Sequence, residues 1–262
     1  MSNERSKPLA FASGTAIGTL GGLIGLGGAE FRLPLLIALF RFRGLEAIIL
    51  NKATSLIVVA SALPFRTAAV PVADVVAQWP IIVNLLAGSL AGAWAGAEWA
   101  TRLKTTTLYR IIAVLLVVIA AILVFAHDAT ASAPAFSGWV LIVAGVAAGF
   151  VIGVIASLLG VAGGEFLIPT LILLFGVDVK LAGSLSLAVS LPTMLVGFAR
   201  YSRDQSFGVL KANKGFLLTM AAGSILGTLI GGLLLGIVPG AILLPMLAVI
   251  LLLSAVKIWR HE

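Results

Sequence analysis

Two ten-residue stretches of this sequence, GLGGAEFRLP at 25–34 and GVAGGEFLIP at 160–169, repeat one pattern of glycines, a glutamate and a proline. The same separation of 135 residues relates AGS at 87–89 to AGS at 222–224, together with the glycines that follow each of them. Chance matches between apolar segments are common, but a constant separation across several segments is not. The two halves of the chain are therefore predicted to share one structure.

The composition places both halves in a membrane. Of the 262 residues, 61% are hydrophobic and 10% are charged, whereas about a quarter of a soluble domain is charged. Many apolar runs approach the roughly 20 residues that a helix needs to cross a bilayer. Since a helix satisfies its backbone polar groups within itself, we predict an all-α polytopic membrane protein.

Each half contains five hydrophobic segments, of which the second is short. The segments lie at about 9–28, 30–40, 45–65, 76–99 and 106–126, and at about 138–161, 165–175, 180–199, 212–235 and 239–258. About a dozen residues cannot span ~30 Å at ~1.5 Å per residue, so each half is predicted to hold a half-membrane helix after a glycine break. We assign 1–126 to the first repeat, 127–138 to an external linker and 139–262 to the second repeat.

The basic residues predict the orientation of the two repeats. Thirteen of the seventeen lysines and arginines lie at connections that fall on one side of the membrane, and the linker HDATASAPAFSG at 127–138 has none. Because basic loops stay in the cytoplasm, we expect a multi-pass protein of the inner (plasma) membrane with both termini cytoplasmic. The first repeat then starts inside and the second outside, which is the inverted-topology repeat of many secondary transporters.

The glycine clusters predict where a substrate binds. Glycine permits a helix break, and Pro34 and Pro169 fit the first turn of a returning helix, where the missing N–H costs little. Two helix starts that meet at mid-membrane would form an anion site from backbone amides, although close helix packing is an alternative explanation for the glycines. The glycines assigned to this site are Gly25, Gly27, Gly28, Gly160, Gly163 and Gly164.

Glu30 and Glu165 are predicted at the starts of the two short helices. A carboxylate is favourable there because of the helix dipole, which is one explanation for both residues. The other is a protonatable pair, since burial disfavours the charged carboxylate and proton binding could then couple to anion movement. Ionised carboxylates in a permanently open pore would repel an anion.

Polar residues in the third segment of each half are candidates for substrate binding. Lys52 lies too deep in its segment to be a loop residue, so it either pairs with one of the glutamates or faces the anion. Arg32 is assigned a structural role, either paired with Glu30 or extending toward the membrane surface. The remaining donors could instead bond within their own helices; they are Asn51, Ser55, Ser184 and Ser186.

Several other classes of protein fit the sequence poorly. Both histidines, His127 and His261, lie outside the apolar segments, so no serine–histidine pair or histidine metal cluster is expected in the membrane. The chain has no cysteine and no phosphate-binding loop, and its basic residues are too scattered for a nucleic-acid surface. We expect no cofactor and no enzymatic activity; a passive anion channel is the main alternative to a carrier.

The paired GLGGAEFRLPLL and GVAGGEFLIPTLILLFG, followed by NKATSL and GSLSLA, resemble the sulfite exporter TauE/SafE family. That family has a GxGGGxxxxP-like motif in each half, from which this sequence departs at Ala29 and Ala162. The resemblance implies secondary, proton-linked transport of sulfite or a small organosulfonate such as sulfoacetate, commonly as export. The anion, the direction of transport, the coupling ion and the presence of a homodimer stay open.

Overall fold

The computed structural model describes residues 6–24, 28–125, 134–234 and 240–259. Within these ranges the chain forms helices joined by short connections, with no strand, which confirms the predicted all-α fold. Gly25 and Gly27 of the first glycine cluster lie outside the described residues.

All ten predicted apolar segments are helices. They are α1 (Lys7–Ile24), α2 (Ala29–Ala38), α3 (Gly44–Ala69), α5 (Trp79–Arg102), α6 (Thr105–Phe125), α7 (Gly138–Leu159), α8 (Gly164–Phe175), α9 (Val179–Tyr201), α11 (Lys214–Leu233) and α12 (Gly240–Trp259). Three short elements were not predicted, namely α4 (Val72–Ala77), η1 (Gln205–Phe207) and α10 (Gly208–Ala212). Within the described residues, six helices are long and apolar enough to cross a membrane, while α8 is a shorter apolar helix.

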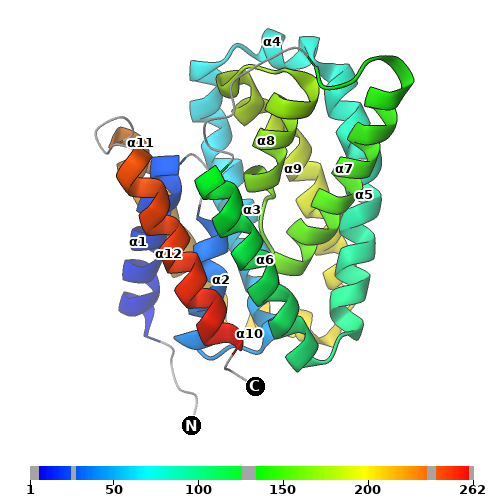
Figure 1. Ribbon diagram of the computed structural model, residues 1–262. Helices are drawn as coiled ribbons and strands as arrows, with labels where there is room; N and C mark the ends of the chain where they lie inside the picture. Colours follow the sequence, from blue (N-terminus) through cyan, green and yellow to red (C-terminus); the bar gives the residue numbers. More distant parts are fainter. Residues whose placement is uncertain (1–5, 25–27, 126–133, 235–239, 260–262) are drawn as a thin grey trace.

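The two ends of the bundle differ in charge. The starts of α1, α3, α6 and α11 and the ends of α2, α5, α9 and α12 lie at the end marked by α10, and α4 lies at the other end (Figure 1). The first end carries Lys7, Arg41, Arg43, Arg102, Lys104, Arg110, Arg200, Arg203, Lys211, Lys214 and Lys257. The α4 end carries Asp74 and Asp178. Basic residues gather on the cytoplasmic side of membrane proteins, so this asymmetry supports the predicted orientation.

Two pairs of helices approach one another through glycines. α1 packs along α11, and α5 packs along α7. A Cβ added to Gly18 would overlap the carbonyl oxygen of Ser224, and one added to Gly153 would overlap that of Ser89. Both residues of the first contact are 135 residues from their counterparts in the second.

Three further contacts obey the same rule. They join Gly14 to Met220 as Gly149 to Leu85, Gly223 to Phe11 as Gly88 to Val146, and Gly227 to Thr15 as Gly92 to Phe150. The separation seen in the sequence is therefore also the separation of equivalent packing contacts. This supports the two predicted repeats, whose boundaries and inverted topology stay predictions.

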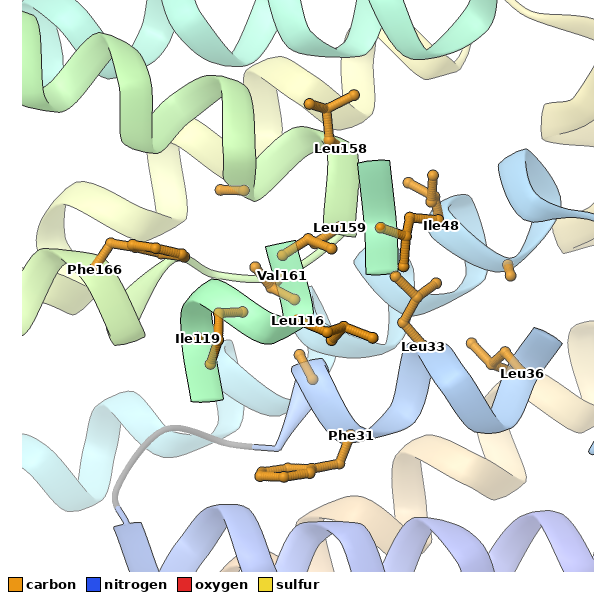
Figure 2. Close-up of a cluster of buried hydrophobic side chains, with 14 of the residues drawn as sticks. Phe31, Leu33, Leu36, Ile48, Leu116, Ile119, Leu158, Leu159, Val161 and Phe166 are labelled. Carbon is orange, nitrogen blue, oxygen red and sulfur yellow. The ribbon is translucent and has the colours of Figure 1, made fainter. Parts of the chain in front are cut away.

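An apolar cluster surrounds the segment between α7 and α8 (Figure 2). Leu159 and Val161 of this segment are fully buried, and they lie among Leu33 of α2, Ile48 of α3 and Leu116 of α6. Side chains from both halves of the chain thus keep water away from the helix break. Any water-filled path to this region requires the cluster to rearrange.

The glycine contacts predict a large effect of a single methyl group. A Cβ at Gly92 would overlap the carbonyl oxygen of Phe150, so α5 and α7 would have to separate in Gly92→Ala. We expect the free energy of unfolding to fall by about 1–3 kcal/mol, the usual cost of overpacking, measured as a lower Tm in detergent. Gly208→Ala is the control, because a Cβ there meets nothing within 4 Å. Equal Tm values for the two variants would contradict the prediction.

Candidate anion site between two short helices

Left-handed glycines shape the two helix breaks. Gly28 precedes α2 with a φ of 70°, Gly160 follows α7 with a φ of 66°, and Gly163 precedes α8 with a φ of 84°. Residues with a Cβ rarely adopt these angles. At Gly160 an added Cβ would also overlap the carbonyl oxygen of Ile48. The predicted breaks are thus present at Gly28, Gly160 and Gly163, and Gly164 is the first residue of α8.

The two short helices run from the interior toward opposite ends of the bundle (Figure 1). α2 ends beside α11, where the rings of Phe40 and Phe216 lie 4.8 Å apart at the basic end. α8 ends toward α4, where Asp178 and Asp74 line a cavity of about 360 Å³. Both helix starts, each with a glutamate in its first turn, therefore lie in the interior.

The two prolines lie deeper in these helices than the sequence analysis placed them. Pro34 and Pro169 are each the sixth residue, within α2 and α8 and not in their first turns. A proline there cannot donate to the carbonyl oxygen four residues earlier, which belongs to Glu30 in one helix and Glu165 in the other. The prolines thus remove one backbone donor from the same position of each helix.

Glu30 and Glu165 meet at the two helix starts. Their exposed fractions are 1% and 3%, and their carboxyl groups interact directly with each other. No hydrogen-bond donor among the described residues reaches their oxygens. Two ionised carboxylates in contact would repel strongly, so this arrangement requires a proton on at least one of them.

Asn51 joins the two halves at this point. Its side-chain N–H₂ group donates to the carbonyl oxygens of Ala29 and Leu159, both at 3.0 Å. These oxygens belong to the start of α2 and the end of α7. Because both N–H donors are used, Asn51 holds the two breaks together and has no free donor for an anion.

Arg32 is fully buried beside the glutamate pair. Its Nη2 donates to Ser55 Oγ at 3.3 Å, and Ser55 donates to the carbonyl oxygen of Asn51 at 2.7 Å. Nε and Nη1 of Arg32 have no partner among the described residues. Arg32 neither extends to the surface nor forms an ion pair with Glu30 within 4 Å.

Lys52 lies away from both glutamates. Its Nζ contacts the carbonyl oxygen of Ala156 and Oγ of Ser157, both at 3.5 Å, at the end of α7. Tyr201 of α9 donates to the carbonyl oxygen of Ser157 at 2.9 Å. Lys52 is completely buried, yet no carboxylate within the described part of the chain pairs with it.

Ser184 and Ser186 are buried in α9. Ser186 donates to the carbonyl oxygen of Gly183 in its own helix at 2.9 Å, and Ser184 Oγ has no partner among the described residues. No hydrogen bond links either serine to the glutamate pair. The cluster around the helix starts therefore consists of Glu30, Glu165, Arg32, Ser55 and Asn51.

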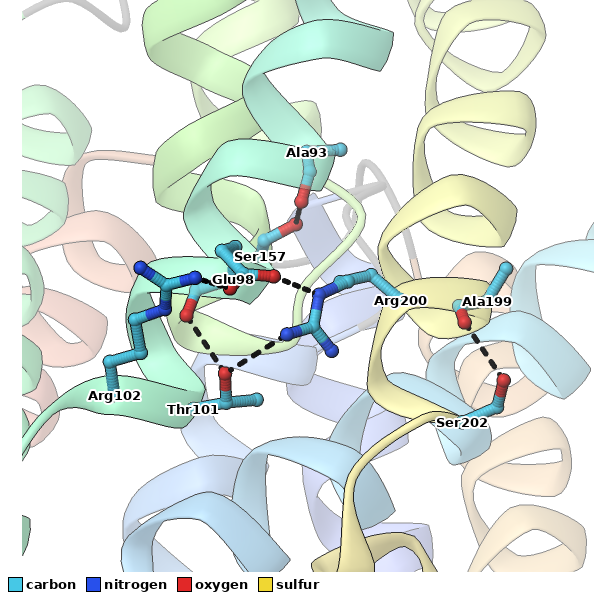
Figure 3. Close-up of polar contacts among 8 residues, drawn as sticks. All are labelled: Ala93, Glu98, Thr101, Arg102, Ser157, Ala199, Arg200 and Ser202. Carbon is cyan, nitrogen blue, oxygen red and sulfur yellow. Dashed lines mark hydrogen bonds and ion pairs between the residues drawn. The ribbon is translucent and has the colours of Figure 1, made fainter.

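A second polar network, which the sequence analysis missed, lies toward the basic end (Figure 3). Glu98 of α5 pairs with Arg102 of the same helix and with Arg200 of α9. Ser157 donates to the carbonyl oxygen of Ala93 at 2.9 Å. The partners of Glu98 and Ser157 are far apart in the sequence, and no motif marks them.

The fold and this buried cluster define the chain as a multi-pass helical membrane protein with a polar site between two broken helices. Residues 6–258 match the family Sulfite exporter TauE/SafE, and the chain belongs to this family of membrane transporters. The family exports sulfite and related anions across membranes. No curated protein and no solved structure matches the chain significantly.

The role of Asn51 can be tested by substitution. Asn51→Ala removes two buried hydrogen bonds and leaves the carbonyl oxygens of Ala29 and Leu159 without this donor. We expect the free energy of unfolding to fall by about 1–3 kcal/mol, measured by denaturant unfolding in detergent. Asn84→Ala, which removes one bond to the carbonyl oxygen of Ile142 at 3.1 Å, should cost less. A larger loss in Asn84→Ala would contradict this role.

Proposed function

We propose that this protein is a secondary transporter that couples protons to the movement of a small anion, with sulfite or a small organosulfonate as substrate. The site lies between the starts of α2 and α8, and the protein resides in the inner membrane with both termini cytoplasmic. Family membership supports the class of substrate. The contact between Glu30 and Glu165 is the observation that supports proton coupling.

The helix starts supply the attraction for the anion. Amides in the first turn of a helix lack partners within it and carry partial positive charge, so a start that faces the interior favours an anion. Gly28 and Gly163 hold no side chain over these amides. An anion can therefore approach the backbone closely at both positions.

The glutamates supply the coupling. When both are protonated, the helix starts face a neutral pair and an anion can bind. When a proton leaves, the negative charge at the same position repels the anion. Anion binding and proton binding then favour each other, as coupled transport requires.

Burial of the cluster separates this function from that of a passive channel. Glu30, Glu165 and Arg32 are at most 3% exposed, so in this conformation the site is closed to both sides. A carrier needs such a closed state, whereas a channel needs a continuous path. The passive channel stays the alternative that transport measurements must exclude.

Proton coupling predicts gradient-driven accumulation. In proteoliposomes, sulfite and methanesulfonate should accumulate above their equilibrium level when a proton gradient points in the same direction as uptake. Glu30→Gln and Glu165→Gln should each lose this accumulation, because glutamine cannot bind and release the proton. Flux of labelled anion with and without the pH gradient measures the effect.

Glu46→Gln is the control, because Glu46 lies in the first turn of α3 and accepts a hydrogen bond from the backbone of Arg43. It should accumulate both anions as the wild type does. If wild-type flux follows only the anion gradient, whatever the pH gradient, the protein is a channel or an uncoupled carrier and the proposal is wrong.

A further inference from the structure

We propose that Arg32 is a direct ligand of the transported anion, and that ionised Glu30 competes with the anion for its guanidinium group. This inference rests on the proposed function, because it assigns the substrate-binding cation of the same site. It gives Arg32 a role in binding in addition to the structural one expected from the sequence.

Arg32 has donors to spare. The side chain is completely buried, yet it makes a single hydrogen bond, from Nη2 to Ser55. Nε and Nη1 have no partner among the described residues. Buried charges are normally paired and fully hydrogen-bonded, since an unpaired one is costly. The free donors therefore mark a place for a negatively charged partner.

The guanidinium group is held in position at the start of α2. Ser55, its partner, is fixed by a hydrogen bond to the carbonyl oxygen of Asn51, and Asn51 donates to the carbonyl oxygen of Ala29. This chain of contacts connects Arg32 to the first residue of α2. The positive group and the amides of the helix start thus act on the same small region.

The charged groups near Arg32 come from three helices. Glu30 lies on α2 and interacts electrostatically with Arg32, Glu165 reaches Glu30 from α8, and Lys52 of α3 is directed toward the end of α7. Helices α1 and α12 also pack against α2, and their described charged residues, Lys7 and Lys257, lie at the basic end. Glu30 is therefore the acid placed to compete for Arg32.

Charge balance explains how competition produces coupling. With one proton on the glutamate pair, its single negative charge balances the positive charge of Arg32. If an anion binds to Arg32, a second proton on the pair keeps the cluster neutral, and a buried site strongly favours neutrality. One proton then accompanies each negative charge of the substrate.

The guanidinium group also defines the class of substrate. Its planar fork of donors binds two oxygens of one group, as in sulfite, a sulfonate or a carboxylate. A halide offers no such pair of oxygens. Leu167 occupies the position 135 residues after Arg32, so the second repeat adds no matching cation.

The experiment measures methanesulfonate binding to the purified protein in detergent. This sulfonate stays ionised at any working pH, so a change of affinity with pH reports on the protein. Arg32→Gln should bind roughly 10- to 100-fold more weakly, the value of a hydrogen bond to a charged group. Arg32→Lys should also bind more weakly, because it loses the fork. Arg203→Gln should bind as the wild type does, since exposed Arg203 stacks on Trp94.

Stability separates a binding role from a purely structural one. Removing an unpaired buried charge should leave the Tm of Arg32→Gln equal to or above that of the wild type. Weaker binding with an unchanged or higher Tm supports the proposal. Wild-type affinity in Arg32→Gln overturns it. If Arg32→Gln does not fold, Arg32→Lys decides by the same measurements, and wild-type affinity in that variant overturns the proposal.

Competition by Glu30 has its own readout. Wild-type affinity for methanesulfonate should fall as the pH rises and the pair loses its proton, whereas Glu30→Gln should keep its affinity over the same range. Equal pH dependence in both proteins overturns the competition. A wild-type protein that binds methanesulfonate through Arg32 but does not carry anions in proteoliposomes would refute the proposed function and leave the role of Arg32 intact.

Discussion

The requirement that backbone polar groups be satisfied inside a membrane governs this structure. A helix that crosses the bilayer meets it alone, but a broken helix leaves amides and carbonyl oxygens without partners. This chain breaks at Gly28 and again at Gly160–Gly163. It surrounds both breaks with protein, ties them together through Asn51, and encloses them in an apolar cluster. The unusual backbone is thereby confined to the one region where it can attract a ligand.

The sequence predicted most of the fold, because its signals are local. Apolar length gave the ten helices, and the glycine clusters gave the two breaks. The sequence also placed Glu30 and Glu165 at the helix starts. Pro34 and Pro169 were placed one turn too early, because the motif does not show at which glycine the helix begins.

The contacts within the site were less predictable, because they depend on how distant segments pack. The hydrogen bonds of Asn51 join residues 108 positions apart. The direction of Lys52 depends on where α7 ends, which no residue near Lys52 reveals. The free donors of Arg32 and the pairing of Glu98 with Arg200 likewise emerge only when the helices are assembled.

The glycine contacts have a mechanical consequence. Where one backbone rests directly on another, no flexible side chain lies between them to absorb sliding or rotation, so α1 with α11 and α5 with α7 each behave as a stiff strut. Any movement that opens the interior must then leave both struts intact. The joints that bend are the glycine turns at the ends of α1 and α7, which adjoin the buried acids. Opening of the bundle and rearrangement of its ionisable groups would therefore be one event.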